Sequence, residues 1–301
     1  MLSTDIGRVL LWMSGALLSF SMMALSIREL GGILNVFEIL SIRSSSGVVI
    51  LSALALLNPQ LRAGLFTRRL PLHTFRNVVN FASQVCWAKG VVLLPFATVF
   101  ALEFTMPAWT ILLAPFFLGE RMTPSRIGAV VFGIAGVLVI LRPGLETFQP
   151  AALIVLAAAL GYAIQIIFTK KLTATETTFA IVFWMNLTQL AIGLAFAGPL
   201  FVGRISLDLI PAILALGASG LFAHYCMTNA FRIGDASVVI PLDFMRIPLI
   251  AVVGWWLYAE PLDIFVFAGA ALIITGILWN LRSETRPVAV PDNRAAAKIG
   301  Q

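Results

Sequence analysis

Residues 94–120, LPFATVFALEFTMPAWTILLAPFFLGE, form an apolar run with a single acid, Glu103, before its closing Gly-Glu pair. A transmembrane helix needs about 20 mostly apolar residues. A charge at the centre of a bilayer costs about 2.5–3.5 kcal/mol on insertion scales, so such residues persist when they are buried and paired, or when they are useful. Two prolines, Pro107 and Pro115, follow the acid. The stretch therefore predicts a bent membrane span with a polar point inside it.

The composition of the 301-residue chain excludes a soluble domain. Hydrophobic residues make up 60% and charged residues only 11%, whereas soluble proteins carry about 25% charged residues. The mean hydropathy is +0.98. The chain is too apolar for disorder, and Cys86 and Cys226 are too few for a disulfide framework. The net charge of +6 comes from short basic clusters between apolar runs, which indicates a lipid bilayer rather than nucleic acid as the partner.

Ten apolar stretches predict an all-α polytopic membrane protein with ten transmembrane helices. The third stretch is the most polar, with Asn77, Asn80 and Gln84, so we expect it to face protein or water. The fifth is short and can be extended to start at Pro124. The predicted spans are Val9–Ile27, Ile33–Leu57, Phe75–Leu94, Phe96–Leu118, Ile127–Leu141, Ala151–Thr169, Thr178–Val202, Leu209–Phe231, Ala236–Tyr258 and Ile264–Leu281.

Basic residues in the short loops predict the orientation. With the N-terminus inside, most loop Lys and Arg fall in inner segments, and the outer segments hold only Arg28, Lys89, Arg142 and Arg204. Cytoplasmic loops carry the excess of Lys and Arg, so we expect both termini in the cytoplasm and the chain in the cell inner membrane. Residues 283–301 are predicted to be a disordered cytoplasmic tail.

The two halves of the chain match weakly when the sequence is shifted by 140 residues. The matches place Leu102-Glu103-Phe104 on Leu242-Asp243-Phe244, Gly119-Glu120 on Ala259-Glu260, and Cys86 on Cys226. They predict two five-helix units, residues 1–145 and 146–282. Because five is odd, the second unit inserts upside down relative to the first, an arrangement that recurs in secondary transporters.

Ten spans, two five-span units and a Gly-Glu pair closing the fourth span resemble the EamA type of the drug/metabolite transporter superfamily. The strongest stretch is residues 94–120 with Arg126-Ile127-Gly128 and Gly133–Gly136, and residues 236–261 repeat it more loosely. Arg43 is similar to an arginine common in the second span of this family. The second repeat departs from the pattern with Ala259 in place of glycine. The resemblance covers about residues 8–282. It implies transport rather than catalysis, with no cofactor.

Polar and aromatic residues inside the spans are the candidates for a substrate or ion pathway. They are Glu38, Arg43, Glu103, Trp109, Trp184, His224, Asp243 and Arg246. Asp243 and Arg246 are three residues apart and share one helix face. One interpretation is a substrate clamp, with Arg246 for a carboxylate and Asp243 for an amine or a proton. The other is a self-neutralised pair that faces a neighbouring helix.

Glu103 occupies the repeat-equivalent position of Asp243, which predicts one central cavity between the halves. Two hypotheses for Glu103 stay open: proton coupling, or a structural bridge to Arg43. Glu38 and Arg43 are five residues apart and face different directions, so we expect Arg43 to reach another helix; Glu38 is either structural or in contact with substrate. The predicted helix hinges are Pro107, Pro115, Pro241 and Pro248.

Two other classes of function are weaker alternatives. Residues 217–220, Gly-Ala-Ser-Gly, look superficially like the serine motif of a rhomboid protease. However, Ser219 and His224 point apart on one helix, and the other histidine, His73, lies at the edge of the third span. The chain also lacks a His-Glu-x-x-His metal motif and a phosphate-binding Gly-rich loop with Lys. A channel or membrane sensor is the second alternative.

The sequence therefore predicts a secondary active transporter of a small zwitterionic or amphipathic metabolite. Export of an amino acid or an amino-acid-derived compound, such as an opine-like metallophore, is preferred over import of riboflavin or S-adenosylmethionine. A homodimer is possible, because small residues in the fifth and tenth spans, including Gly136 and Gly276, allow close helix packing.

Overall fold

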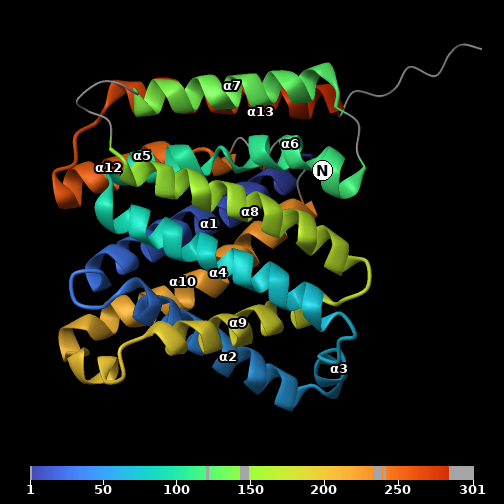
Figure 1. Cartoon of the computed structure of the whole chain (residues 1–301), viewed down its shortest axis with the longest axis vertical. Coiled ribbons are helices and arrows are strands. Elements are labelled where there is room, and N and C mark those ends of the chain that lie inside the picture. Colours follow the sequence, from blue (N-terminus) through green and yellow to red (C-terminus); the bar gives the residue numbers. More distant parts are fainter. Residues whose placement is uncertain (1, 120–121, 143–148, 234–238, 240–241, 285–301) are drawn as a thin grey trace, which may run out of the picture.

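A computed structural model describes residues 2–119, 122–142, 149–233, 239 and 242–284 of the chain, and its helices are labelled in Figure 1. The described elements are α1 (Leu2–Leu30), α2 (Val36–Leu57), α3 (Pro59–Ala63), α4 (Leu70–Leu93), α5 (Phe96–Glu103), α6 (Met106–Leu118), α7 (Pro124–Leu141), α8 (Ala151–Thr173), α9 (Thr178–Phe196), α10 (Ile210–Ile233), α12 (Arg246–Tyr258) and α13 (Ile264–Glu284), with short 3₁₀ turns at Phe201–Arg204 and Leu207–Leu209.

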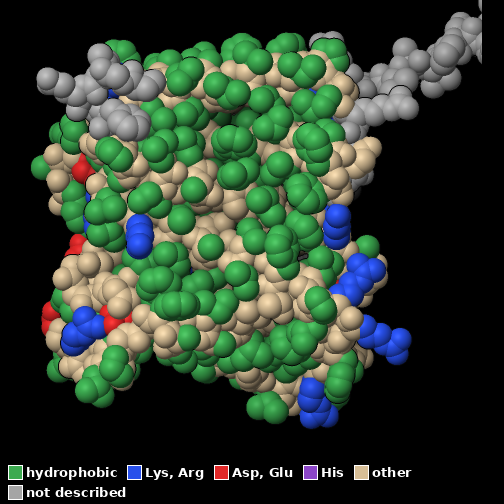
Figure 2. Space-filling view, in the orientation of Figure 1, with side chains coloured by type: hydrophobic (Ala, Val, Ile, Leu, Met, Phe, Trp, Pro, Cys, Tyr) green, Lys and Arg blue, Asp and Glu red, His purple; other side chains and the backbone are tan. Residues whose placement is uncertain are grey.

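The helices confirm the predicted membrane protein. Eight described segments are long and apolar enough to cross a bilayer, and α12 is a shorter apolar helix. With the polar helix α4, they make up the ten predicted spans. Apolar side chains cover the face shown in Figure 2. A surface of this kind is stable against lipid, which replaces water as the solvent.

Two details of the span predictions are confirmed. The fifth span begins at Pro124, because the Thr123 side chain caps the helix by accepting a hydrogen bond from the Arg126 N–H. The third span, α4, buries its polar residues inside the protein: Asn77 is fully buried, and Asn80 is 4% exposed.

The fourth span is broken, and the expected continuous helix over Phe96–Leu118 is wrong in this respect. α5 ends at Glu103 and α6 begins at Met106. The Thr105 N–H bonds the Leu102 carbonyl, an i→i−3 contact that replaces the helical i→i−4 bond. Pro107, in the first turn of α6, lacks the N–H that would bond the Glu103 carbonyl.

The ninth span is broken at the repeat-equivalent point. Phe244 and Met245 form a turn, and α12 begins at Arg246, so Ala236–Tyr258 is not one continuous helix either. The rings of Phe104 and Phe244 meet with centroids 4.8 Å apart. The two breaks therefore lie against each other.

Both half-helices after the breaks end in the same way. α6 and α12 each contain 13 residues and finish with a left-handed residue, Gly119 at φ 69° and Ala259 at φ 52°. Glycine adopts this conformation freely, whereas alanine pays a steric cost. The second repeat has therefore kept the backbone geometry of the Gly-Glu motif without its glycine.

Helix pairing follows the inverted repeat. Four helix pairs have the most extensive contacts: α1 with α10, α4 with α8, α2 with α9, and α7 with α13. If each helix is replaced by its equivalent in the other half, the pair of α1 and α10 becomes the pair of α8 and α4. The pair of α2 and α9 and the pair of α7 and α13 stay the same. Figure 1 shows α7 and α13 side by side at one edge of the molecule, with α2 and α9 at the opposite edge.

The small residues of the fifth and tenth spans pack these two helices together within one chain. A Cβ atom at Gly136 would lie 2.5 Å from the Gly269 carbonyl oxygen, and one at Gly276 would lie 3.2 Å from the Ala129 backbone. Only glycine permits such an approach. This face is therefore used inside the protomer, and the homodimer stays a prediction.

The seventh span is shorter than expected. We expected Thr178–Val202, but α9 ends at Phe196 and a 3₁₀ turn follows at Phe201–Arg204. Pro199 disfavours the helical conformation for the residue before it. The N–H of that residue, Gly198, donates to the Glu38 carboxylate at 3.1 Å instead of to a helix carbonyl.

Candidate substrate site at the helix breaks

The two broken spans bring three charged side chains together where their breaks meet. Arg246, the first residue of α12, donates to the Asp243 carboxylate, and its Nη1 lies 3.8 Å from Oε1 of Glu103. Glu103 is the last residue of α5. The carboxylates therefore sit at equivalent points of the two repeats, with one arginine between them. We call Glu103, Asp243 and Arg246 the central cluster.

Arg246 is the enclosed member of the central cluster. Its guanidinium carbon lies 3.9 Å from the Phe20 ring centroid and 5.5 Å from that of Phe104. The Arg246 side chain is 5% exposed, whereas those of Glu103 and Asp243 are 22% and 21% exposed. The carboxylates, and not the arginine, are thus the accessible groups.

Trp87 of α4 fixes the Glu103 side chain. Its indole Nε1 donates to Oε2 of Glu103 at 2.7 Å, and its ring meets Phe100 edge to face. A carboxylate with a donor on each side keeps one orientation. Glu103 thus contacts Trp87 and Arg246, and not Arg43 as in the hypothesis of a structural bridge; proton coupling stays a prediction.

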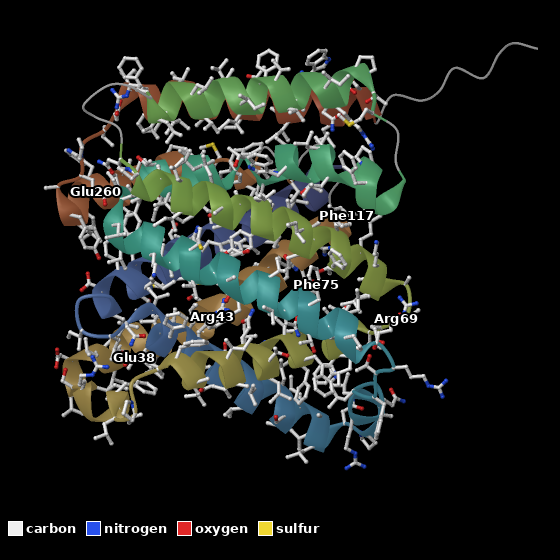
Figure 3. The ribbon with its side chains drawn as sticks, in the orientation of Figure 1. Glu38, Arg43, Arg69, Phe75, Phe117 and Glu260 are labelled. Carbon is white, nitrogen blue, oxygen red and sulfur yellow. The ribbon has the colours of Figure 1, made fainter. Side chains whose placement is uncertain are left out.

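Arg43 reaches other helices, as expected from its separation from Glu38. Its Nη2 donates to Oε1 of Gln84 in α4 and, at 3.0 Å, to Oε1 of Gln189 in α9. Figure 3 shows Arg43 midway between the end of the molecule marked by Glu260 and the end marked by Arg69. We call Arg43, Gln84 and Gln189 the Arg43 group.

The Arg43 group and the central cluster contact the same stretch of α4. Gln84 accepts a hydrogen bond from Arg43, and Trp87, three residues later, donates to Glu103. Residues three apart share one face of a helix. A molecule placed beside this face of α4 can therefore meet groups of both charge signs.

Polar contacts continue along α4 away from the central cluster. The Gln84 amide donates to Asn80 at 3.4 Å, and Asn77 donates to the Trp184 carbonyl at 3.0 Å and to Thr188 at 3.2 Å. Residues 77, 80 and 84 are spaced so that they share one face of the helix. This face joins α4 to α9 by hydrogen bonds instead of apolar packing.

Glu38 lies apart from the central cluster, at the N-terminus of α2 (Figure 3). It forms a capping box with Asn35, accepts a hydrogen bond from Gly198 and pairs with Arg204. It is fully buried. These contacts tie α2 to the segment after α9 and favour the structural interpretation of Glu38, which stays a prediction.

The remaining candidates are scattered. Trp109 is half-buried in α6. The Trp184 indole donates to the Leu65 carbonyl at 3.0 Å, in the segment between α3 and α4. His224 belongs to α10, but its side chain lies outside the described residues.

The four predicted hinge prolines have different positions. Pro107 and Pro248 lie in the first turns of α6 and α12, directly after the breaks. Pro115 lies inside α6, which continues past it. Pro241 is outside the described residues.

A further ion pair lies at the end of the protein that Glu260 marks in Figure 3. Arg28, near the end of α1, pairs with Glu260 and donates to the carbonyls of Val91 and Leu94. Glu260 also accepts the Phe96 N–H at 2.8 Å. The Arg28 guanidinium stacks 3.5 Å from the Phe96 ring centroid. This Arg28–Glu260 latch joins the ends of α1, α4 and α12 to the start of α5.

Sequence reasoning missed several residues of these arrangements. Arg28 was counted only as a loop charge, and Phe20 and Gln189 carried no signal of their own. Their roles depend on contacts between distant helices; Arg28 and Glu260, for example, are 232 residues apart. In the described part of the chain, no three His, Cys, Asp or Glu side chains are placed to hold a metal ion.

Comparison with known proteins agrees with this architecture. The EamA-like transporter family matches the chain twice, at residues 7–142 and 149–282. A solved crystal structure with 19% sequence identity has the same fold, with a TM-score of 0.62 over 93% of this chain and 99% of the other.

Curated relatives are transporters for different compounds. The S-adenosylmethionine uptake transporter of Rickettsia prowazekii is 26% identical and covers 92% of this chain and 94% of its own. The riboflavin transporter of Rhizobium johnstonii is 32% identical over 71% of each chain. The pseudopaline exporter CntI of Pseudomonas aeruginosa is 27% identical over 88% of this chain and 93% of its own.

These relatives point to transport of a small molecule across a membrane and not to an enzyme. The repeated family match and the two broken spans whose breaks meet lead to the same assignment. The chain belongs to the EamA-like transporter family of the drug/metabolite transporter superfamily.

Proposed function

We propose that this protein is a secondary active transporter of a small zwitterionic metabolite derived from an amino acid, and that it exports this compound. The observation that carries the proposal is the central cluster. Its two carboxylates lie at equivalent breaks of the two repeats, where inverted-repeat transporters bind substrate. With both acids ionised and one arginine between them, the cluster has one net negative charge. It thus suits a cationic group such as an ammonium.

The central cluster also supports coupling to protons. Glu103 and Asp243 are the accessible members of the cluster, and each can bind a proton when no substrate cation is present. Exchange of a proton for the cationic group of the substrate then keeps the charge of the central cluster constant. Intramembrane carboxylates of this kind mark proton relays in other transporters.

Orientation and direction are parts of the same proposal. Lys and Arg side chains on the face shown in Figure 2 gather at the end where Figure 1 places the N-terminus, which supports a cytoplasmic location for that end. The Arg28–Glu260 latch then lies at the outer end of the protein. When the latch is closed, substrate can enter from the cytoplasmic side. Uptake of S-adenosylmethionine is the second candidate, because relatives with that name align over 92% of the chain.

Two measurements test the proposal. The first compares metabolites in medium and cells of a deletion strain and an overproducing strain. An amino-acid-derived compound retained by the deletion strain and released by the overproducer supports export. A compound that only the deletion strain leaves in the medium would show import.

The second measurement compares two Asp→Asn variants. Asp243→Asn should abolish transport with normal membrane insertion, because it removes a carboxylate from the central cluster. Asp263→Asn is the matched control: it breaks a partly exposed pair with Arg142 at the latch end and should leave transport intact. Wild-type transport by Asp243→Asn would refute the role of the cluster.

A further inference from the structure

The Arg43 group contains buried hydrogen-bond donors without acceptors. Arg43 Nε and Gln189 Nε2 are both buried, and neither has a hydrogen-bond partner among the described residues. Gln189 is fully buried. Buried donors are paired in nearly all proteins, and an unpaired one is costly. Two such donors joined through the bond from Arg43 Nη2 to Gln189 Oε1 indicate a missing acceptor.

The charge of Arg43 is also unmatched by its hydrogen-bond partners. Carboxylates pair with four other arginines of the described chain: Arg28, Arg142, Arg204 and Arg246. Arg43 instead donates to the neutral amides of Gln84 and Gln189. A buried guanidinium is stable when a carboxylate compensates for lost hydration. The acceptor that fits this position is therefore an anion.

Two features are combined at Arg43 and not at Arg76, Arg142 or Arg246. Arg142 and Arg246 also have a buried Nε without a partner, but each of them pairs with a carboxylate. Arg76, which is 5% exposed on α4, has neutral partners as Arg43 does, Thr169 at 2.9 Å and Asn77 at 3.0 Å. However, its nitrogens are absent from the buried atoms that lack a partner. Arg76 is thus satisfied by the protein, whereas Arg43 is not.

We propose that Arg43 Nε and Gln189 Nε2 bind the carboxylate of the transported metabolite. Gln84, which binds Arg43, and Trp87, which binds Glu103, are three residues apart on α4, so the cationic end of the same molecule can face Glu103 and Asp243. This assignment rests on the proposed function and reverses one sequence prediction: Arg43 takes the carboxylate, and Arg246 holds the two acids. The substrate class is then an α-amino acid or a derivative that keeps its carboxylate.

The test uses matched probes that differ only in the carboxylate. Purified protein in proteoliposomes is assayed with S-adenosylmethionine against decarboxylated S-adenosylmethionine, histidine against histamine, and riboflavin as a probe without either charge. The wild-type protein should bind and transport the carboxylated member of at least one pair about 10- to 100-fold better than its partner, as expected for hydrogen bonds to a charged group.

Substitutions then show which residues cause the preference for the carboxylated probe. Arg43→Gln and Gln189→Met should each lose about tenfold or more in affinity for the carboxylated probe and change binding of the decarboxylated probe less than about twofold. Arg76→Gln, the control, should keep the preference. If Arg43→Gln does not fold, the wild-type preference and Gln189→Met still decide the matter.

The outcomes separate the two proposals. Equal handling of both members of a pair overturns the carboxylate site but leaves the zwitterion transporter intact. Transport of riboflavin alone, or binding of no member of either pair, overturns the proposed function and the carboxylate site with it. A preference that survives both Arg43→Gln and Gln189→Met places the carboxylate elsewhere and refutes this assignment.

Discussion

Neutralising Glu260 should open the end of the protein that the Arg28–Glu260 latch closes. Glu260→Gln keeps the size of the side chain but removes its charge, which weakens the pair with Arg28 and the hydrogen bond from Phe96. The side chains of Arg28 and Glu260 are only 13% and 12% exposed, so solvent screens the pair weakly. Hydrogen bonds to a charged group contribute about 1.5–3 kcal/mol. The equilibrium between open and closed forms should therefore shift about 10- to 150-fold.

A native cysteine reports this opening. Cys86 is a free, partly buried cysteine next to Trp87 on α4, five residues before Val91 of the latch. In a Cys226→Ala background, Glu260→Gln should raise the rate at which a membrane-impermeant thiol reagent labels Cys86 from outside. When opening is fast and rare, this rate follows the open population, so the expected rise is also about 10- to 150-fold.

The control variant is Asp263→Asn, which breaks the partly exposed pair with Arg142 at the same end. Its labelling rate should match that of the background protein, because such pairs contribute little. An unchanged rate in a folded Glu260→Gln protein would show that the latch does not hold this end closed. Faster labelling from the cytoplasmic side alone would refute the proposed orientation.

Three further substitutions are expected to act on stability. Ala259→Gly should raise the melting temperature of the purified protein, because the left-handed conformation at φ 52° costs alanine about 1–2 kcal/mol. The greater entropy of glycine in the unfolded chain offsets part of this gain in stability. Glu38→Gln should lower the free energy of unfolding by about 1–3 kcal/mol through loss of the charged partner of Arg204, without changing the transport KM. Gly136→Ala should destabilise the protein by about 1–3 kcal/mol, because the new Cβ would lie 2.5 Å from the Gly269 carbonyl. Thermal unfolding in detergent and transport assays check all three.

The fold could be predicted from the sequence because each span signals its presence locally. The apolar runs, the shifted match between the halves and the polar face at Asn77 and Asn80 all reappear in the structure. The Pro124 start of α7 was also readable, because threonine followed by proline is a common way to begin a helix.

The site could be predicted only in part, because span position says nothing about which helices face one another. Glu103, Asp243 and Arg246 were found as charges inside apolar spans, and they do meet. The breaks were expected at prolines but lie just before Pro107 and Pro248. The hydrogen-bond partners of Arg43 could not be predicted from the sequence, since Gln84 and Gln189 belong to different repeats.

Burial indicates which halves of the broken spans can move. α5 is held in the core: Phe96, Val99, Phe100 and Leu102 are fully buried. α12 shares this core through Ile247, Ile250 and Ala251, whereas Phe116 of α6 is 81% exposed. Segments with few buried contacts open at lower free energy than the core. We therefore expect α6 to swing about Phe104–Thr105 while α5 keeps Glu103 in place. Because the Phe104 and Phe244 rings touch, movement at one break changes the packing of the other. This contact gives the two repeats a physical means of opening in alternation around one substrate.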